Sequence, residues 1–122
     1  MKITILTVGK VKEKYFTGAI QEYSKRLSRY CKLDVIELPE TRLPEDPSPA
    51  EIQKALAAEA NAIRQKLEAG AVVAMCIEGK TCSSEALSKK LADFALEGKS
   101  RVTFLIGGSF GLDETLKKQA DW

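Results

Sequence analysis

Three glycines behind an apolar run are the residues of this sequence best suited to contacting a ligand. The run Phe104 to Ile106 is followed by Gly107, Gly108 and Gly111. Glycine is used where a loop needs a positive φ or where a ligand approaches the backbone, and Asp113 can cap a helix just behind the loop. The pattern predicts a strand that ends in a ligand-binding loop, although a tight connection that binds nothing has the same glycine-rich appearance.

The glycine spacing disfavours a nucleotide phosphate as the ligand. It is not the G-x-G-x-x-G of dinucleotide sites, and no lysine completes a G-x-x-x-x-G-K loop. The chain has no histidine and three cysteines, so the sequence predicts neither a metal site nor a disulfide scaffold. We expect Cys31 and Cys76 to be small hydrophobes in strands and Cys82 to lie in a turn. No nucleophile is expected among them, since no histidine can form the usual thiolate pair.

Basic residues are concentrated in the first part of the chain. Residues 1–32 carry eight Lys or Arg against two Glu, a charge of +6, whereas residues 33–70 carry −4 and the whole chain only +2. Such a region fits the phosphate backbone of a nucleic acid, and a solvated helix face has the same composition. The candidate RNA-binding residues are Lys10, Lys12, Lys14, Lys25, Arg26 and Arg29.

The length of 122 residues fits a single domain, 1–122, that can bury a core without disulfides or metals. Hydrophobic residues make up 44% and charged residues 30%, as in globular proteins. No apolar run approaches the roughly 18 residues of a membrane span, and the start of the chain does not read as a signal peptide. We therefore expect a cytoplasmic protein with no membrane partner.

Alternating periodicities predict the elements that position the glycine loop. Strands are predicted at Lys2–Val8, Cys31–Leu38, Ala71–Ile77 and Arg101–Ile106. Helices are predicted between them, with buried stripes at Phe16, Ala19, Ile20, Tyr23, Leu27 and Tyr30, then Ile52, Leu56, Ile63 and Leu67, then Leu87, Leu91 and Phe94. The second helix starts with a capping box, Ser48-Pro49-Ala50-Glu51. The alternation predicts a three-layer α/β domain with a mainly parallel sheet, whose ligands bind beyond the carboxyl ends of the strands.

Several separated motifs, in order along the whole chain, resemble one family. They are Met1 to Lys10, Glu22-Tyr23 with Lys25-Arg26-Leu27, Gly79-Lys80 with Ser83-Ser84-Glu85, and Ile106-Gly107-Gly108 with Gly111-Leu112. With these motifs the sequence resembles the bacterial ribosomal RNA large subunit methyltransferase H family. Its members are SPOUT methyltransferases that N3-methylate a pseudouridine.

The resemblance implies an S-adenosylmethionine-dependent enzyme of rRNA processing that acts on the ribosome in the cytoplasm. It also implies a homodimer and a C-terminal trefoil knot that holds the cofactor without a metal. By resemblance, Met75 and Gly107 contact the cofactor, while Gly108 and Gly111 shape the loop. No catalytic residue is carried over, and Glu78, the one acid beside the glycine turns in the sequence, is interpreted as an exposed structural carboxylate.

Family members continue past the position of Trp122 with a strand, a proline-containing loop and a long helix. The chain is therefore expected to be a C-terminally shortened SPOUT-like domain with an incomplete knot. We expect it to be poorly folded or to self-associate through an uncovered sheet face. Two alternatives stay open: a non-catalytic remnant that self-associates or contacts RNA without holding cofactor, and a flavodoxin-like domain that binds another small ligand.

Overall fold

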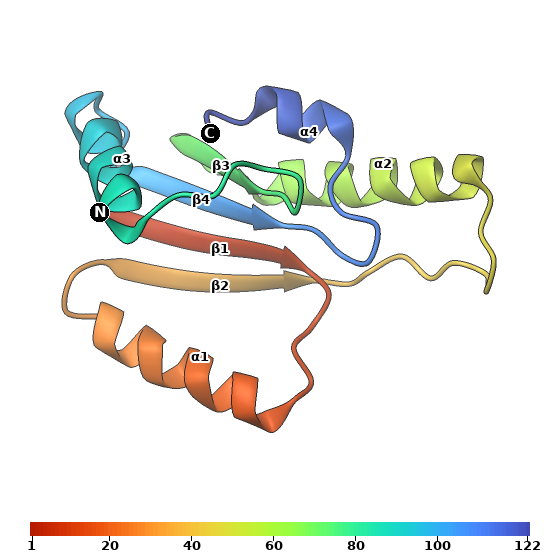
Figure 1. The fold of residues 1–122 in the computed structure, drawn as a ribbon, viewed down its shortest axis with the longest axis horizontal. Coiled ribbons are helices and arrows are strands. Elements are labelled where there is room, and N and C mark those ends of the chain that lie inside the picture. Colours follow the sequence, from red (N-terminus) through yellow and green to blue (C-terminus); the bar gives the residue numbers. More distant parts are fainter.

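The computed structural model describes residues 1–122, in which strands and helices alternate along the chain. The strands are β1 (Lys2–Val8), β2 (Lys32–Leu38), β3 (Ala71–Met75) and β4 (Arg101–Ile106). The helices are α1 (Lys14–Leu27), α2 (Pro49–Lys66), α3 (Ser84–Leu96) and α4 (Glu114–Gln119). The predicted alternation is confirmed, and Figure 1 shows the strands side by side with the helices around them.

All four strands are parallel and lie in the order β2-β1-β4-β3. The predicted bounds of β1 and β4 are confirmed, and β2 begins one residue later than predicted. β3 ends at Met75 rather than Ile77, because the N–H of Gly79 donates to the carbonyl of Cys76 at 3.0 Å and turns the chain. Ile77 is fully exposed in that turn.

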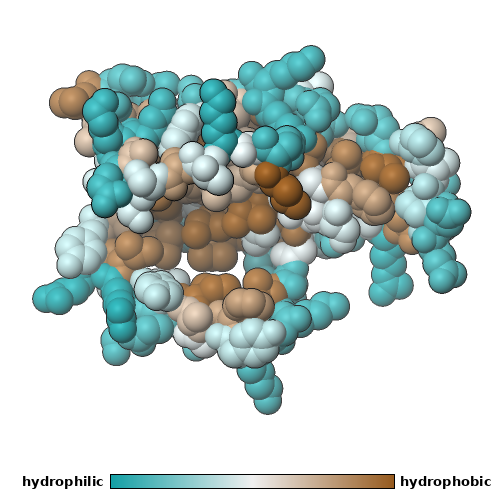
Figure 2. Space-filling view, in the orientation of Figure 1, coloured by the Kyte–Doolittle hydropathy of each residue, from teal (hydrophilic) through white to brown (hydrophobic).

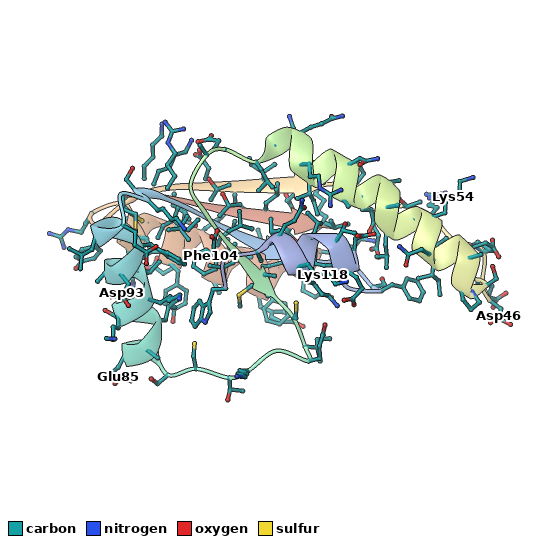
Figure 3. All side chains as sticks on the ribbon, turned by 90° about the horizontal axis from the view of Figure 1, so that it is seen from above. Asp46, Lys54, Glu85, Asp93, Phe104 and Lys118 are labelled. Carbon is teal, nitrogen blue, oxygen red and sulfur yellow. The ribbon has the colours of Figure 1, made fainter.

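Two clusters of buried apolar side chains lie on opposite faces of the sheet. The larger cluster packs α2 and α4 on the strands through Ile63 and Leu116, with Leu6 and Leu105 fully buried beneath them. The smaller cluster packs α3 on β3 and β4 through Phe94, which is 2% exposed. Figure 3 shows α2 and α3 on opposite sides of the strands. The structure therefore has the predicted three layers.

Hydroxyl caps start two of the helices where the sequence places them. At α2, Ser48 Oγ accepts from the N–H of Glu51 at 3.2 Å, and Glu51 Oε1 accepts from the N–H of Ser48 at 3.1 Å. At α3, Ser83 Oγ accepts from the N–H of Ala86 at 3.0 Å. Each contact satisfies an amide that has no partner within its helix, so these helix starts are fixed by local sequence.

The apolar stripe of α1 is not buried, and the sequence prediction is wrong on this point. Phe16 is 54% exposed, Tyr23 is 62% exposed, and the helix has no buried residue. The helix lies beside β2, and Figure 2 shows its apolar side chains across a hollow from apolar side chains of the sheet. Periodicity identifies the apolar face of a helix but not the element that covers it.

The sheet face that carries α3 is covered only in part. Val35 of β2 and Ile106 of β4 are 44% and 40% exposed on it, and Ile5 of β1 lies half-buried between these strands. Together with the stripe of α1 these side chains form one apolar surface, which we call the open face. It consists of Ile5, Val35, Ile106, Phe16, Ile20, Tyr23 and Leu27.

The last residues of the chain pair with the outer edge of β3. The N–H of Trp122 donates to the carbonyl of Val72 at 3.2 Å, and the carbonyl of Trp122 accepts from the N–H of Ala74 at 2.8 Å. This is the hydrogen-bond pattern of a parallel pair, with Trp122 opposite Val73. The carboxylate of Asp121 also accepts from the N–H of Val72, at 2.8 Å. Trp122 is thereby held beside the carboxyl half of β3.

Candidate cofactor site

The carboxyl ends of the four strands meet at one edge of the sheet. The register aligns Leu38 of β2 with Val8 of β1, and Met75 of β3 with Ile106 of β4. Four connecting segments therefore lie close together at this edge: Gly9-Lys10, Pro39-Glu40, the turn at 76–80 and the glycine loop at 107–111. This is the edge at which parallel α/β sheets bind ligands.

A cavity of about 340 Å³ opens at the end of β3. Met75 is 53% exposed there, and Trp122 stands on the other side of β3 from β4. Gly79 and Lys80 contribute from the turn that follows β3, and Lys117 contributes from α4. Most of the lining is apolar, and its members are Val73, Ala74, Met75, Cys76, Gly79, Lys80, Cys82, Lys117 and Trp122. The cavity suits a flat apolar group with a charged end.

Lys117 ties α4 to the turn at 76–80. Its ammonium donates to Glu78 Oε1 at 2.5 Å and to Glu114 Oε1 at 3.1 Å. These hydrogen bonds, first with Glu78 and then with Glu114, raise the pKa of Lys117 above its ordinary value. The same contact with Lys117 lowers the pKa of Glu78. Lys117 is thus a fixed cation at the cavity, and Glu78 is an exposed, ion-paired carboxylate, as predicted.

The predicted strand positions of two cysteines are wrong, because β2 begins one residue after Cys31 and β3 ends one residue before Cys76, and Cys82 lies in the segment that leads to α3. Cys31 and Cys76 are half-buried and Cys82 is exposed. Burial, followed by the negative charge of Glu78, raises the pKa of the Cys76 thiol. A thiol with a raised pKa is protonated at neutral pH and is a poor nucleophile. Cys76 and Cys82 therefore act as part of the cavity wall.

The glycine loop is a tight turn that leads from β4 to α4. The N–H of Gly111 donates to the carbonyl of Gly108 at 3.0 Å, and Gly111 has φ +82°, a conformation that favours glycine. Asp113 then caps α4 by accepting from the N–H of Thr115 at 2.8 Å and from the Thr115 hydroxyl. These bonds, led by that from the hydroxyl, lower the pKa of Asp113. The loop is thus held at both ends.

The structure brings only some of the predicted cofactor residues to the cavity. Met75 lines it, and Gly107 adjoins it because Met75 is in register with Ile106. Gly108 points instead toward the segment after β2, where a Cβ would lie 2.6 Å from Glu40 Oε1. Gly111 adjoins the packing of α4 against α2.

Sequence reasoning missed three residues at this edge: Trp122, Lys117 and Glu40. Trp122 and Lys117 line the cavity, and Glu40 accepts a hydrogen bond from the glycine loop. Glu78 is consequently not the one acid beside the glycine turns, which corrects the sequence interpretation. No local pattern marks these residues, since they reach the site from segments far away in the sequence.

Five of the six predicted RNA-binding residues fall into two groups, and the sixth, Lys14, begins α1. Lys10 and Lys12 line a cleft of about 540 Å³ beyond the ends of β1 and β2, and they share it with Glu37 and Glu40. Lys25 and Arg26 lie in the last turn of α1, and Arg29 follows just after the helix. At 1.5 Å per residue, Lys25 is about 17 Å along the axis from Lys14. Since α1 returns the chain to the start of β2, this second group lies toward the opposite edge of the sheet.

No group of three or more His, Cys, Asp or Glu side chains is arranged to hold a metal ion. No helix has the length and apolar character needed to cross a lipid bilayer.

Known proteins are similar to this chain over its whole length. A family model described as "Predicted SPOUT methyltransferase" matches residues 1–122. The ribosomal RNA large subunit methyltransferase H of Streptococcus suis (strain 05ZYH33) is 50% identical over 122 residues, which cover 99% of this chain and 77% of that protein. The protein of the same name from Acetivibrio thermocellus is 47% identical over 123 residues, covering 100% of this chain and 77% of the relative. The one from Leuconostoc citreum is 46% identical, with 99% and 77% covered. With every residue matched and relatives this similar, the chain belongs to the SPOUT methyltransferase family.

Proposed function

We propose that this chain is an S-adenosylmethionine-dependent methyltransferase that modifies a pseudouridine of large-subunit ribosomal RNA. The observation that carries the proposal is the apolar cavity at the carboxyl edge of the sheet, beside the glycine loop. The names of the relatives, ribosomal RNA large subunit methyltransferase H, support the substrate class. The family resemblance supports the pseudouridine as the target.

The cavity fits the proposed cofactor in size and in chemistry. Its volume of about 340 Å³ is in the range of small-molecule sites, about 300 to 1,000 Å³. Met75 and Trp122 offer apolar walls for an adenosyl group. Lys80 lines the same cavity and forms no ion pair, so it is available for a carboxylate. The proposed cofactor-binding set is Met75, Gly107, Gly108 and Gly111, to which we add Lys80 and Trp122.

S-adenosylmethionine, when bound, supplies an electrophilic methyl group on a sulfonium. The residues of this chain would contribute enclosure and alignment, which supply much of the rate when a reaction joins two positioned groups. We assign no general base to the chain. Cys76 keeps its proton because its pKa is raised, and Glu78 is engaged by Lys117.

The two basic groups would contact ribosomal RNA in different ways. Lys10 and Lys12 lie at the same edge of the sheet as the cofactor site, whereas Lys25, Arg26 and Arg29 lie away from it. Reversing the charges of Lys25, Arg26 and Arg29 should weaken ribosome binding and lower its salt slope by up to about three, roughly one for each phosphate that is no longer neutralised. An unchanged slope would remove this group from the RNA interface.

We also propose that the chain is one SPOUT-like domain, residues 1–122, that works as a homodimer in the cytoplasm. The match of the family model over these residues and the single sheet support one domain. The exposed side chains of the open face, among them Phe16 and Val35, support association with a second copy.

A second candidate is a chain that contacts RNA or self-associates without holding the cofactor. Met75 favours it to a degree, because at 53% exposure this side chain is enclosed on only part of its surface. The two candidates differ in their affinity for the cofactor. Calorimetric titration with S-adenosylmethionine should give micromolar affinity if the site works, and no heat at millimolar ligand if it does not.

The enzymatic proposal is tested with the protein and intact ribosomal subunits. Trp122 is the only tryptophan and lines the cavity, so its fluorescence should change saturably with S-adenosylhomocysteine. Labelled methyl groups should be transferred to large-subunit RNA from cells that lack the modification. Met75→Asp, which places a charge in the apolar wall, should abolish both signals, while Leu96→Ala on α3 should leave them unchanged. Binding without transfer to any ribosomal particle would overturn the assigned substrate.

A further inference from the structure

Glu40 connects the segment after β2 to the glycine loop after β4. Its Oε1 accepts a hydrogen bond from the N–H of Ser109 at 2.6 Å, across 69 positions of sequence. To reach the loop, the side chain passes the end of β1, where a Cβ on Gly9 would be in ordinary contact with Glu40 Oε2 at 3.7 Å. From the segment after β2, one carboxylate thus binds the loop after β4 and lies close to the segment after β1.

The fit between Glu40 and the loop is close. A Cβ built on Gly108 would lie 2.6 Å from Oε1 and 2.8 Å from the carboxyl carbon of Glu40. Gly108 has no positive φ, so its backbone would accept alanine. A Cβ at position 108 would therefore act on Glu40 alone, by displacing the end of its side chain from the loop.

The carboxylate of Glu40 has no competing partner. It forms no ion pair, although Lys10 and Lys12 line the same cleft, and its side chain makes one hydrogen bond, with Ser109. A hydrogen bond from a backbone N–H to a carboxylate is charge-assisted and about twice as strong as one between neutral groups. The contact also occupies the N–H of Ser109, so that amide is not free for a ligand.

Glu40 also separates two clefts at this edge. On one side lies the cleft that contains Lys10 and Lys12. On the other side a cleft of about 320 Å³ is bordered by Arg42, Ser109 and Phe110. Removal of the side chain would join these clefts and release the loop between them.

We propose that Glu40 is a positioning residue for the cofactor, which fixes the shape of the loop at 107–111 by holding the N–H of Ser109. The inference rests on the proposed function, because it assigns the loop to cofactor binding. Glu40 acts through the loop and does not itself contact the reacting atoms. Without it the loop has more conformations, and the cofactor must then select among them at a cost in affinity.

The first test compares Glu40→Ala with Glu45→Gln, a change in an exposed carboxylate of the same segment that forms no hydrogen bond with the loop. In Glu40→Ala the amide of Ser109 should exchange its hydrogen at least about tenfold faster. The Kd for S-adenosylhomocysteine should rise about tenfold, the equivalent of one charged hydrogen bond. Glu40→Gln keeps an acceptor oxygen and should recover part of the affinity. Both measurements should be unchanged in Glu45→Gln.

The second test is a double-mutant cycle between positions 40 and 108. Gly108→Ala should weaken cofactor binding in the presence of Glu40 and have little further effect in Glu40→Ala, because the colliding carboxylate is then gone. A purely structural contact would lower the melting temperature of each variant and leave the affinity of the folded protein unchanged.

The outcomes separate this inference from the function on which it rests. If the unmutated chain binds S-adenosylhomocysteine and Glu40→Ala binds it equally well, the positioning role is overturned while the cofactor site stands. Strictly additive effects in the cycle would overturn the contact with Gly108. If the unmutated chain does not bind, the proposed function fails, and the exchange rate of the Ser109 amide still decides whether Glu40 holds the loop.

Discussion

Truncation of Phe16 on α1 tests whether the open face joins two copies of the chain. Phe16 is 54% exposed and lies beside Tyr15, at 4.6 Å between ring centroids. An aromatic side chain offers roughly 200 Å² of apolar surface, so the exposed part is about 110 Å² and its burial contributes about 2.7 kcal/mol at 25 cal/mol per Å². Phe16→Ala removes this contribution from each copy.

The expected effect on the dimer is large because both copies contribute. If a partner covers half of the exposed area on each copy, the total cost is about 2.7 kcal/mol, or roughly a 100-fold rise in the dimer Kd. Sedimentation velocity over a range of protein concentrations measures this constant. Leu96→Ala is the matched control, since Leu96 is 87% exposed on α3 and lies outside the open face.

Three results would refute this reasoning. The first is an unmutated chain that sediments as a monomer at every concentration and melts cooperatively. The second is an equal effect of Phe16→Ala and Leu96→Ala, which would point to nonspecific association. The third is a large fall in melting temperature for Phe16→Ala at concentrations where the chain is monomeric, because Phe16 would then belong to the core.

Three further changes test the local structure around the site. Ser48→Ala removes the cap of α2 and should cost about 1 kcal/mol, seen as a fall of about 4 °C in a thermal melt. Gly70→Ala should destabilise the chain more than Gly98→Ala. Both glycines have positive φ, but a Cβ at Gly70 would collide with the carbonyl of Arg101, whereas a Cβ at Gly98 would meet open space. The pKa of Asp113 is lower in the folded chain than its unfolded pKa of about 3.9, so its ionised carboxylate stabilises the fold above that pH. This stabilisation is lost as the pH falls through the folded pKa. Asp113→Asn should therefore make the free energy of unfolding less dependent on pH on the acid side.

Each of these three predictions would be contradicted by a specific outcome. An unchanged melt for Ser48→Ala would mean that α2 is held by packing alone. Equal destabilisation at Gly70 and Gly98 would show that the backbone conformation, and not the approach of Arg101, sets the cost. Urea titrations at several pH values between 2 and 6 that give parallel profiles for Asp113→Asn and the unmutated chain would remove Asp113 from the acid transition.

The features that the sequence predicts well are those encoded over short stretches. The caps at Ser48 and Ser83 need only the residues three positions further on, and the bounds of β1 and β4 follow from alternation within six or seven residues. The glycine loop is equally local, because its turn closes between Gly108 and Gly111. Local hydrogen bonding and local periodicity thus account for the helices and strands. The parallel orientation of the strands follows from the alternation of strands and helices.

The residues that sequence analysis missed depend on the way distant segments meet. Glu40 reaches the glycine loop only because β1 lies between β2 and β4 in the sheet. Trp122 lines the cavity because the chain returns to the edge of β3 after α4. The wrong prediction that the apolar stripe of α1 is buried also arises because burial depends on how distant segments pack. Its stripe is apolar at helical spacing, but Phe16 and Tyr23 stay more than half exposed beside the strands and helices of the structure.

The same principle changes the meaning of the charge asymmetry. The sequence assigns +6 to residues 1–32, but the fold places acidic side chains from later segments beside several of these cations. Lys2 pairs with Asp34 at 3.5 Å and Glu68 at 2.8 Å, and Lys10 and Lys12 share their cleft with two glutamates.

Two of the cations that form no ion pair lie toward the far end of α1. Arg26 pairs with Glu22 at 3.1 Å, whereas Lys25 and Arg29 form no ion pair. Since unpaired cations are free to neutralise a phosphate backbone, these two side chains should contribute more than Arg26 to the salt dependence of RNA binding. They lie away from the cofactor cavity of their own copy, so an RNA strand held by them must reach the site by crossing the open face or by lying against a second copy. The position of these charges thus links RNA binding to the association that Phe16→Ala tests.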